Sequence, residues 1–536
     1  MDFLEQTVRD EIESFTRRLG SVKGRRRGAL LIRSTGTGGG TYVIESSVEG
    51  TRLWSDALRS NEHVHVEIIG DAMQIVAILQ GREDAREAFQ SGRVRVRGNL
   101  GYLNEVLLEL SVIKKPIYFL LRVTAVLTAN TAGTQSLGEN VGTQVRPATP
   151  YLRDPAVHTG PGDSCVKDEI NLANMQLLSS GACFGLDVEN LRYVIATSDL
   201  LHTRECGDMG HQATVDWLAM KAAEPVEDNP YRDSVIIIYR WGSGSQPSGQ
   251  GCSGLDYPYI LMPGKYYNSR FVDGRTVLGS SHLTHELGHF MGLDHPFPSL
   301  ADRLAELASL RGRNQTNLPL TIANLLSLSG VNAQELYEAK ALAERYIATW
   351  PYTLDQDGGV PEALPESVTV RDTPVDLGHA LPLLFGFPAC GGSTSYVLSR
   401  YDPAWLQPVN DAAGKVVWWQ PTFGAEEHQY QERILIDDRV TNNVMSYWQC
   451  DPASQGYSAD QVRRMHFVLT ERRQNLIART IRLFEDFAPT RDFVRARATE
   501  SRNRLLRSDQ LLQGAPSRAA PVGLRACGVK TIDPVR

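Results

Sequence analysis

The sequence has no long uninterrupted hydrophobic run. Its longest apolar segment, residues 117–127, is interrupted by Arg122, and a bilayer-spanning helix needs about 20 apolar residues. The chain opens on an acidic amphipathic stretch, residues 1–5, where an export signal would have a basic region and then an apolar run. We therefore expect no transmembrane segment and a cytoplasmic location, with leaderless secretion as the alternative.

An excess of charge of one sign is also lacking. The formal net charge is −7 over 536 residues, which argues against nucleic acid as the main partner. With 42% hydrophobic and 22% charged residues, the composition is that of a soluble globular protein. The length alone favours about three or four domains.

Cysteine is scarce and no Cys-x-x-Cys pair occurs, so the cysteines do not indicate a zinc site. The seven cysteines are Cys165, Cys183, Cys206, Cys252, Cys390, Cys450 and Cys527. Their odd number leaves at least one thiol unpaired. Cys165 precedes the segment that carries the metal motif described next. Its thiolate could block a catalytic metal, although an ordinary buried or paired cysteine is the favoured interpretation.

One stretch carries a metal-binding pattern. His285 and His289 are four residues apart, so on a helix both imidazoles face the same side and can bind one ion. Glu286 is then placed to hold a metal-bound water. A continuing helix would carry His295 to the wrong face, so the chain must turn, and Gly292 sits where a positive φ would allow it. Three histidine nitrogens and an open fourth position are typical of catalytic zinc.

The alternative is an amphipathic core helix with incidental histidines, but the added glycine and third histidine at fixed offsets favour zinc. The string from His285 to His295 resembles the signature of the metzincin metallopeptidases. Residues 442–447 supply the tight methionine turn that this family carries downstream, with Met445 at its centre. By itself, Met445 would be interpreted as a core methionine.

Three further stretches resemble the pappalysin branch of that family: residues 370–374, residues 443–450 and residues 457–465. The resemblance implies a zinc endopeptidase with an α+β catalytic domain over residues 163–485. Glu286 would be the general base, Tyr447 would stabilise the oxyanion, and Met445 would underlie the metal. It also implies that peptide substrate adds to the last strand before the zinc helix, predicted at residues 259–262.

The same resemblance implies calcium as a further ion and a Cys390–Cys450 disulfide. The missing export signal favours reduced thiols instead, so the two indications conflict. Because the segment before the methionine turn departs from the family pattern, no cleavage preference is carried over.

The first 115 residues show a different pattern. A helix is expected over residues 1–20, strands over 28–34, 41–47, 64–69 and 93–97, and short helices over 71–79 and 84–90. The glycine run 36–40 predicts a hairpin turn, because no Lys-Ser/Thr follows it as in a phosphate-binding loop. The stretch 88–101 resembles the sterol carrier protein family, which implies a five-stranded sheet, helices over one face and a lipid or acyl ligand. The alternating arginines Arg93, Arg95 and Arg97 could meet head groups, but a solvated sheet face is favoured.

The rest of the chain divides by composition. Residues 116–162 are predicted to be a linker, residues 298–440 an insertion with helices near 300–310 and 332–346 and strands at 416–419 and 434–436, and residues 486–536 a partly helical or disordered tail. A capping box at Ser458 predicts a helix running through Ile481.

The sequence thus predicts a zinc endopeptidase acting on proteins or peptides, with a lipid-binding domain in front of it. Two alternatives are a lipid-binding or lipid-transfer protein with a vestigial peptidase scaffold, and an adaptor working through the insertion.

Overall fold

The computed structural model describes thirty-odd helices and strands in two compact units, Met1–Leu293 with Gln461–Arg536 and Asp294–Asp460. The described residues are 3–21, 28–47, 50–55, 65–114, 116–131, 140–141, 144–145, 165–206, 210–242, 251–263, 269–272, 275–278, 281–296, 341, 344, 347–349, 368–373, 376, 394–410, 416–436, 438–446, 455–477 and 481–483. Each unit is described by itself.

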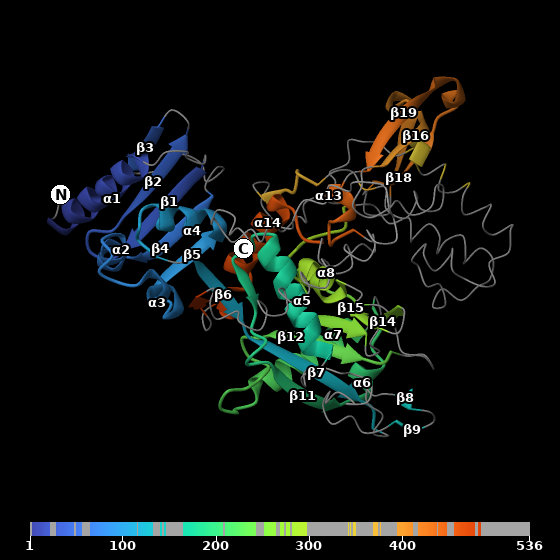
Figure 1. The fold of residues 1–536 in the computed structure, drawn as a ribbon, viewed down its shortest axis with the longest axis horizontal. Coiled ribbons are helices and arrows are strands. Elements are labelled where there is room, and N and C mark those ends of the chain that lie inside the picture. Colours follow the sequence, from blue (N-terminus) through green and yellow to red (C-terminus); the bar gives the residue numbers. More distant parts are fainter. Residues whose placement is uncertain are drawn as a thin grey trace, which may run out of the picture. The chain divides into compact units, whose positions relative to one another are not determined.

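The first unit begins with a five-stranded sheet in the order β3-β2-β1-β4-β5 (Figure 1). Its strands are β1 (Gly28–Thr35), β2 (Gly40–Ser47), β3 (Gly50–Ser55), β4 (Val66–Asp71) and β5 (Val94–Gly98). β1 and β2 pair antiparallel across the glycine run, as the sequence predicts, while β1 and β4 are parallel. β3 is not predicted from the sequence, because its short Gly-Thr-Arg-Leu-Trp-Ser segment lacks a clear alternation.

Four helices accompany this sheet: α1 (Phe3–Ser21), α2 (Ala72–Leu79), α3 (Ala85–Gln90) and α4 (Leu100–Glu109). The first three match the predicted helices, and α4 was missed. α1 buries Val8, Ile12 and Phe15 and contacts β2 and β3, whereas α2 contacts β1 and β4. Asp71 begins α2 by accepting hydrogen bonds from two backbone N–H groups, as an N-cap residue does.

Two of the alternating arginines, Arg93 just before β5 and Arg97 within it, form ion pairs within the protein. Arg93 forms an ion pair with Glu83 at 2.5 Å, and Arg97 forms ion pairs with Glu67 at 3.6 Å and Glu471 at 3.1 Å. These partners favour a charged, partly exposed sheet face over a head-group site, in agreement with the preferred interpretation of the sequence.

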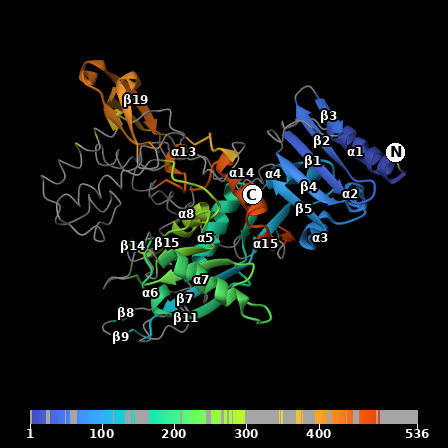
Figure 2. The same ribbon diagram turned by 180° about the vertical axis from the view of Figure 1, so that it is seen from behind.

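A second sheet of the first unit is wholly parallel, in the order β11-β7-β12-β13. Figure 2 labels two of its strands, β7 and β11. Its strands are β7 (Val123–Ala129), β11 (Arg192–Thr197), β12 (Val235–Arg240) and β13 (Tyr259–Pro263). β7 lies at its centre, so the prediction of a linker from residue 116 is wrong for residues 117–129. Every residue of β7 is buried, its two threonines included, because a strand flanked on both edges and covered on both faces is enclosed on all sides.

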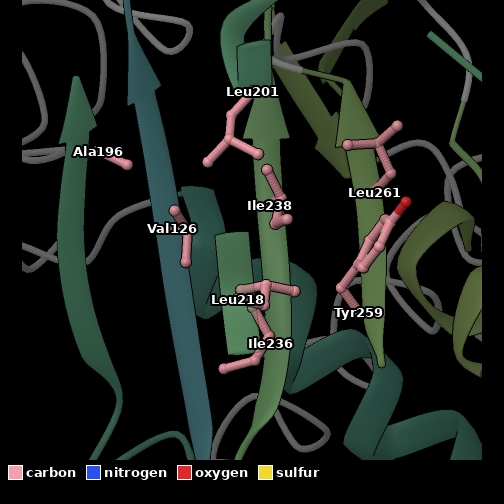
Figure 3. Close-up of a cluster of buried hydrophobic side chains, with 8 residues drawn as sticks. All are labelled: Val126, Ala196, Leu201, Leu218, Ile236, Ile238, Tyr259 and Leu261. Carbon is pink, nitrogen blue, oxygen red and sulfur yellow. The ribbon is translucent and has the colours of Figure 1, made fainter. Parts of the chain in front are cut away.

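Helices cover both faces of the parallel sheet. Figure 3 shows one face, where strand side chains meet Leu201 of α6 (Asp199–His202) and Leu218 of α7 (Gly210–Ala223). Successive strand residues point to opposite faces, so Tyr239, next to Ile238 of this cluster, points the other way. There its hydroxyl donates to Glu169 of α5 (Cys165–Ser179) at 2.8 Å. Cys165, considered above as a latency thiol, is the first residue of α5.

The end of the chain returns to the first unit through α14 (Ala459–Glu471), α15 (Gln474–Ile477) and β20 (Ile481–Leu483). β20 pairs antiparallel with β6 (Ile117–Leu121), which also pairs with β10 (Phe184–Leu186). The prediction of one helix through Ile481 is therefore wrong. The helix stops before Arg473, whose guanidinium covers the ring of Phe290 at 3.4 Å and donates to the Phe290 carbonyl at 3.0 Å.

The remaining described strands form small two-stranded sheets. They are β8 (Asn140–Val141) with β9 (Gln144–Val145) and β14 (Ser269–Val272) with β15 (Arg275–Leu278) in the first unit, then β16 (Thr394–Tyr401) with β19 (Gln429–Ile436) and β17 (Leu406–Asn410) with β18 (Val416–Pro421) in the second. The second unit also has α13 (Asp438–Thr441) and the short 3-10 helices η4 (Pro403–Trp405) and η5 (Ala425–His428).

The two strands predicted in the insertion are confirmed by β18 and β19. The helices predicted near 300–310 and 332–346 lie almost wholly outside the described residues, as does the tail 486–536. Among the described residues, no helix is both long and apolar enough to cross a membrane.

His466 of α14 gives the fold a pH dependence. Burial lowers its pKa to about 3, and its Nε2 accepts the Cys183 N–H at 3.2 Å, so the imidazole is neutral in the folded protein. In the unfolded chain its pKa is near 6.5, so the unfolded state binds more protons and stability falls as the pH drops from about 6.5 towards 3. We expect His466→Gln, which retains an acceptor, to reduce the loss of unfolding free energy between pH 7 and pH 4 by about 3 kcal/mol.

Urea unfolding at the two pH values measures this difference. His428→Gln, at an exposed side chain of η5, serves as the control. An unchanged pH profile in His466→Gln would show that the imidazole does not govern acid stability.

Candidate metal centre

The predicted zinc helix is α8 (His282–Phe290), and a neighbouring helix fixes its start. Gln176 of α5 donates to the Ser281 hydroxyl at 2.6 Å and accepts from the Thr284 hydroxyl at 2.5 Å. Both views show α5 and α8 side by side (Figure 1, Figure 2). The first turn of α8 is therefore anchored by a buried amide rather than by its own N-cap side chain.

The end of α8 contains the predicted turn at Gly292, whose φ is 78°. The Leu293 N–H donates to the Gly288 carbonyl and the Gly292 N–H to the His289 carbonyl, both at 2.9 Å. This pair of bonds defines a Schellman motif, which terminates a helix and reverses the chain at a left-handed residue. Arg464 of α14 further binds the Gly292 carbonyl at 3.4 Å.

The turn brings together the three predicted ligands. One ring nitrogen from each of His285, His289 and His295 lies within 4.8 Å of the others. The Nε2 atoms of His285 and His289 are 3.1 Å apart. The Nδ1 of His289 lies 2.7 Å from the Leu293 carbonyl, which can only accept, so the ring proton is on Nδ1 and Nε2 is the nitrogen that presents its lone pair.

Glu286 lies beside these imidazoles and is 4% exposed. Its Oε1 is 3.4 Å from His282 Nε2, whereas its buried Oε2 has no hydrogen-bond partner among the described residues. Burial acts to raise the pKa of Glu286, but His282, His285 and His289 beside it act to lower it and outweigh burial, so its pKa lies below the ordinary value. The carboxylate is thus ionised near neutral pH, with one oxygen available.

The donor set fits a zinc ion. Three imidazole nitrogens at this spacing, one of them oriented by a backbone carbonyl, are ligands that zinc prefers, and no fourth protein ligand joins them among the described residues. An unpartnered carboxylate oxygen beside the cluster fits a water or substrate proton at the fourth position.

The strand edge next to the site differs from the prediction. The outer edge of β13 is occupied by Cys252, which exchanges two backbone hydrogen bonds with Leu261 at 2.9 and 3.0 Å. Cys252 is also joined to Cys206 by a disulfide with a Cα–Cα distance of 5.9 Å. The prediction that β13 offers a free edge to substrate is therefore wrong, and the segment 251–253 lies outside it.

Sequence reasoning also missed two residues at the site, Gly251 and His282. The Gly251 N–H donates to His282 Nε2 at 3.0 Å, and His282 contacts Glu286. His282 and Glu286 are four residues apart on one helix, and this spacing could have predicted the contact between them. Nothing in the Gly- and Ser-rich segment around residue 250 marks it as a strand.

The methionine turn belongs to the second unit. The Met445 N–H donates to the Asn443 side chain at 2.9 Å and the Ser446 N–H to the Asn443 carbonyl at 3.0 Å, so the chain turns tightly here. Met445 is fully buried. Tyr447, Cys390 and Cys450 lie outside the described residues, so the predicted oxyanion residue and disulfide stay predictions.

The stretch 370–374 also has a structural role in the second unit. Asp372 accepts hydrogen bonds from the Ser458 hydroxyl at 2.6 Å and from the Asp460 N–H at 3.0 Å. The Asp372 carboxylate, 86 positions before Ser458, therefore supports the first turn of α14. The sequence predicted a local capping box at Ser458 instead.

Comparison with known proteins adds little to this site. No protein-family model matches the chain, and no curated protein matches it. Among solved structures, a sterol carrier protein 2 like 2 from Aedes aegypti is 17% identical, with an alignment that covers 18% of this chain and 87% of that chain. The TM-score is 0.15.

The positive φ of Gly292 leads to a prediction for the stability and zinc affinity of the Gly292→Ala variant. Gly292→Ala should lower the unfolding free energy by about 1–2 kcal/mol, because an alanine is strained at positive φ. If the turn opens to relieve that strain, zinc binding should weaken by up to about tenfold, since 1.4 kcal/mol corresponds to a factor of ten.

Gly81→Ala is the matched control, because Gly81 has a φ of 70° and an added Cβ would meet nothing within 4 Å. It should lose similar stability and leave zinc affinity unchanged. Both are measured by denaturation and by competition with a chromophoric chelator. Equal zinc affinity in the two variants would show that the turn does not place His295.

Proposed function

We propose that the protein is a zinc-dependent endopeptidase. The observation that carries this proposal is the cluster of His285, His289 and His295 beside a buried carboxylate with one oxygen unpartnered. A structural zinc site would use a fourth protein ligand, whereas three ligands and an adjacent base are typical of hydrolysis.

The roles of the residues follow from their geometry. When bound, zinc would lower the pKa of a water towards about 7 and polarise the scissile carbonyl. Glu286 accepts the proton of the attacking water on its free Oε2 and passes it to the leaving amine. The Leu293 carbonyl holds His289 in the tautomer that presents Nε2.

The resemblance to metzincins adds two roles to the proposal. Tyr447 would hydrogen-bond the developing oxyanion, and Met445 would supply an apolar floor near the imidazoles. The tight turn and complete burial of Met445 are compatible with that role.

The main rival is a binding or lipid-transfer protein with a vestigial peptidase scaffold. The geometry of the site favours the enzyme, because the ligand tautomer, the left-handed turn and the free carboxylate oxygen are all in place. None of these features is needed merely to pack α8 into a core, where leucines would serve better.

Metal content and cleavage test the proposal together. We expect the purified chain to bind about one equivalent of zinc and to cleave members of a mixed peptide library. Glu286→Gln should retain the zinc but lose about 100-fold or more in turnover, the usual contribution of a positioned general base.

Elemental analysis and mass spectrometry of the products supply the two measurements, and a chelator followed by added zinc supplies the control. Normal cleavage by Glu286→Gln would show the assigned mechanism to be wrong. Absence of both zinc and cleavage in the wild-type protein would favour the scaffold alternative.

A second proposal concerns the first sheet. The five strands with α1 and α2 packed on them agree with what the sterol carrier resemblance implies, and they favour an acyl or sterol ligand for residues 1–115. Such a ligand would place the peptidase near lipids or lipidated substrates.

The physical requirement is apolar burial, because each buried methylene contributes about 0.8 kcal/mol and ten of them suffice for micromolar binding. We expect the full chain to take up a fluorescent fatty acid with micromolar affinity, and unlabelled fatty acid to displace it. Native mass spectra should show a bound lipid. If neither experiment detects one, this part of the chain is a spacer.

A further inference from the structure

His282 lies between the active-site carboxylate and the strand segment outside β13. Its Nε2 accepts the Gly251 N–H at 3.0 Å and lies 3.4 Å from Glu286 Oε1. We propose that His282, held by Gly251, is a positioning residue that fixes the orientation of Glu286. This inference rests on the proposed peptidase function and names a residue outside the metal motif.

The contact with the Gly251 N–H, the shorter of the two, determines how the His282 imidazole is held. One nitrogen cannot donate to Glu286 while it accepts the Gly251 N–H, and 3.4 Å is long for a hydrogen bond. The Gly251 bond is therefore the one that fixes the ring. The ring in turn occupies the space beside Oε1, and Oε2 is left as the oxygen without a partner.

Gly251 is itself fixed from two sides. Its neighbour Cys252 is hydrogen-bonded to Leu261 of β13 and cross-linked to Cys206. The backbone N–H that holds His282 thus belongs to the sheet rather than to a free loop. Side chains around a catalytic group need such support, because a carboxylate that can rotate spends less time in the reactive orientation.

The close approach also explains why residue 251 is a glycine. A Cβ at this position would lie 2.5 Å from His282 Nε2, 2.8 Å from Glu286 Oε1 and 2.9 Å from Glu286 Cγ. Real Cβ atoms do not make such contacts, so any side chain would displace the imidazole or the carboxylate. Gly254 in the same segment differs, because its added Cβ would come no closer than 3.5 Å to the Tyr257 ring, an ordinary van der Waals contact.

Substitutions of His282 separate orientation from simple packing. His282→Leu retains bulk but loses the Gly251 hydrogen bond that fixes the side chain beside Glu286, whereas His282→Gln has an amide oxygen to accept the Gly251 N–H. We expect His282→Leu to lower kcat by about 10-fold to 100-fold, as loss of an orienting partner does, with KM and zinc content unchanged. His282→Gln should recover most of that loss.

Alanine variants of Gly251 and Gly254 supply the second part of the experiment. Gly251→Ala should lower kcat as His282→Leu does, while Gly254→Ala should have the kcat of the wild-type protein. Hydrogen exchange of the Gly251 amide, measured by NMR, gives a readout independent of activity. Protection should fall in His282→Leu and persist in His282→Gln.

Each outcome decides the proposal. Full kcat in His282→Leu, equal impairment of the leucine and glutamine variants, or unchanged amide protection in His282→Leu would overturn it. Failure of the peptidase proposal is distinguishable, because the wild-type protein would then show no cleavage at all.

Discussion

The metal centre depends on one backbone constraint, the reversal of the chain at Gly292. A straight helix can present two imidazoles to one ion but not a third one six residues further on. The positive φ of Gly292 ends the helix and redirects the chain within two residues. The hydrogen bond between His289 and the Leu293 carbonyl then forms across the same turn, so the turn both delivers a ligand and sets the tautomer of another.

The surroundings of α8 make this turn rigid. Gln176 holds the first turn of the helix, while Arg464 and Arg473 bind carbonyls at its end. Both arginines come from the region of α14, and Arg473 is largely buried, which lowers its pKa to about 10. Buried guanidinium groups of this kind are costly unless they are hydrogen-bonded. Loss of these hydrogen bonds would therefore leave both the carbonyl groups and the guanidinium charges without partners.

Local rules account for what the sequence could predict. The offsets of the three histidines and Gly292 follow from helix geometry, and the hairpin of β1 and β2 follows from a glycine run between alternating strands. Failures occurred where distant segments decide the outcome. β7 was predicted as part of a linker, because an apolar run indicates burial but not which strands and helices bury it. The start of α14 was predicted as a local capping box, because its partner Asp372 lies far away in the sequence.

The same limitation applied at the site itself. His282 lies one helical turn before Glu286, but its importance depends on Gly251, and no pattern within residues 251–254 predicts that Cys252 pairs with Leu261 of β13. Tertiary pairing of an irregular segment has no periodicity to detect.

The pairing of β6 with β20 has a consequence for biosynthesis. These strands are separated by about 360 residues, yet β6 directly precedes β7, the central strand of the parallel sheet. On the ribosome, the edge of β6 that pairs with β20 stays unpaired until about 360 further residues have been made. Chain topology of such high contact order slows folding and leaves an unpaired edge exposed to other chains in the meantime. The nascent protein should therefore depend on chaperones until its last described strand is synthesised.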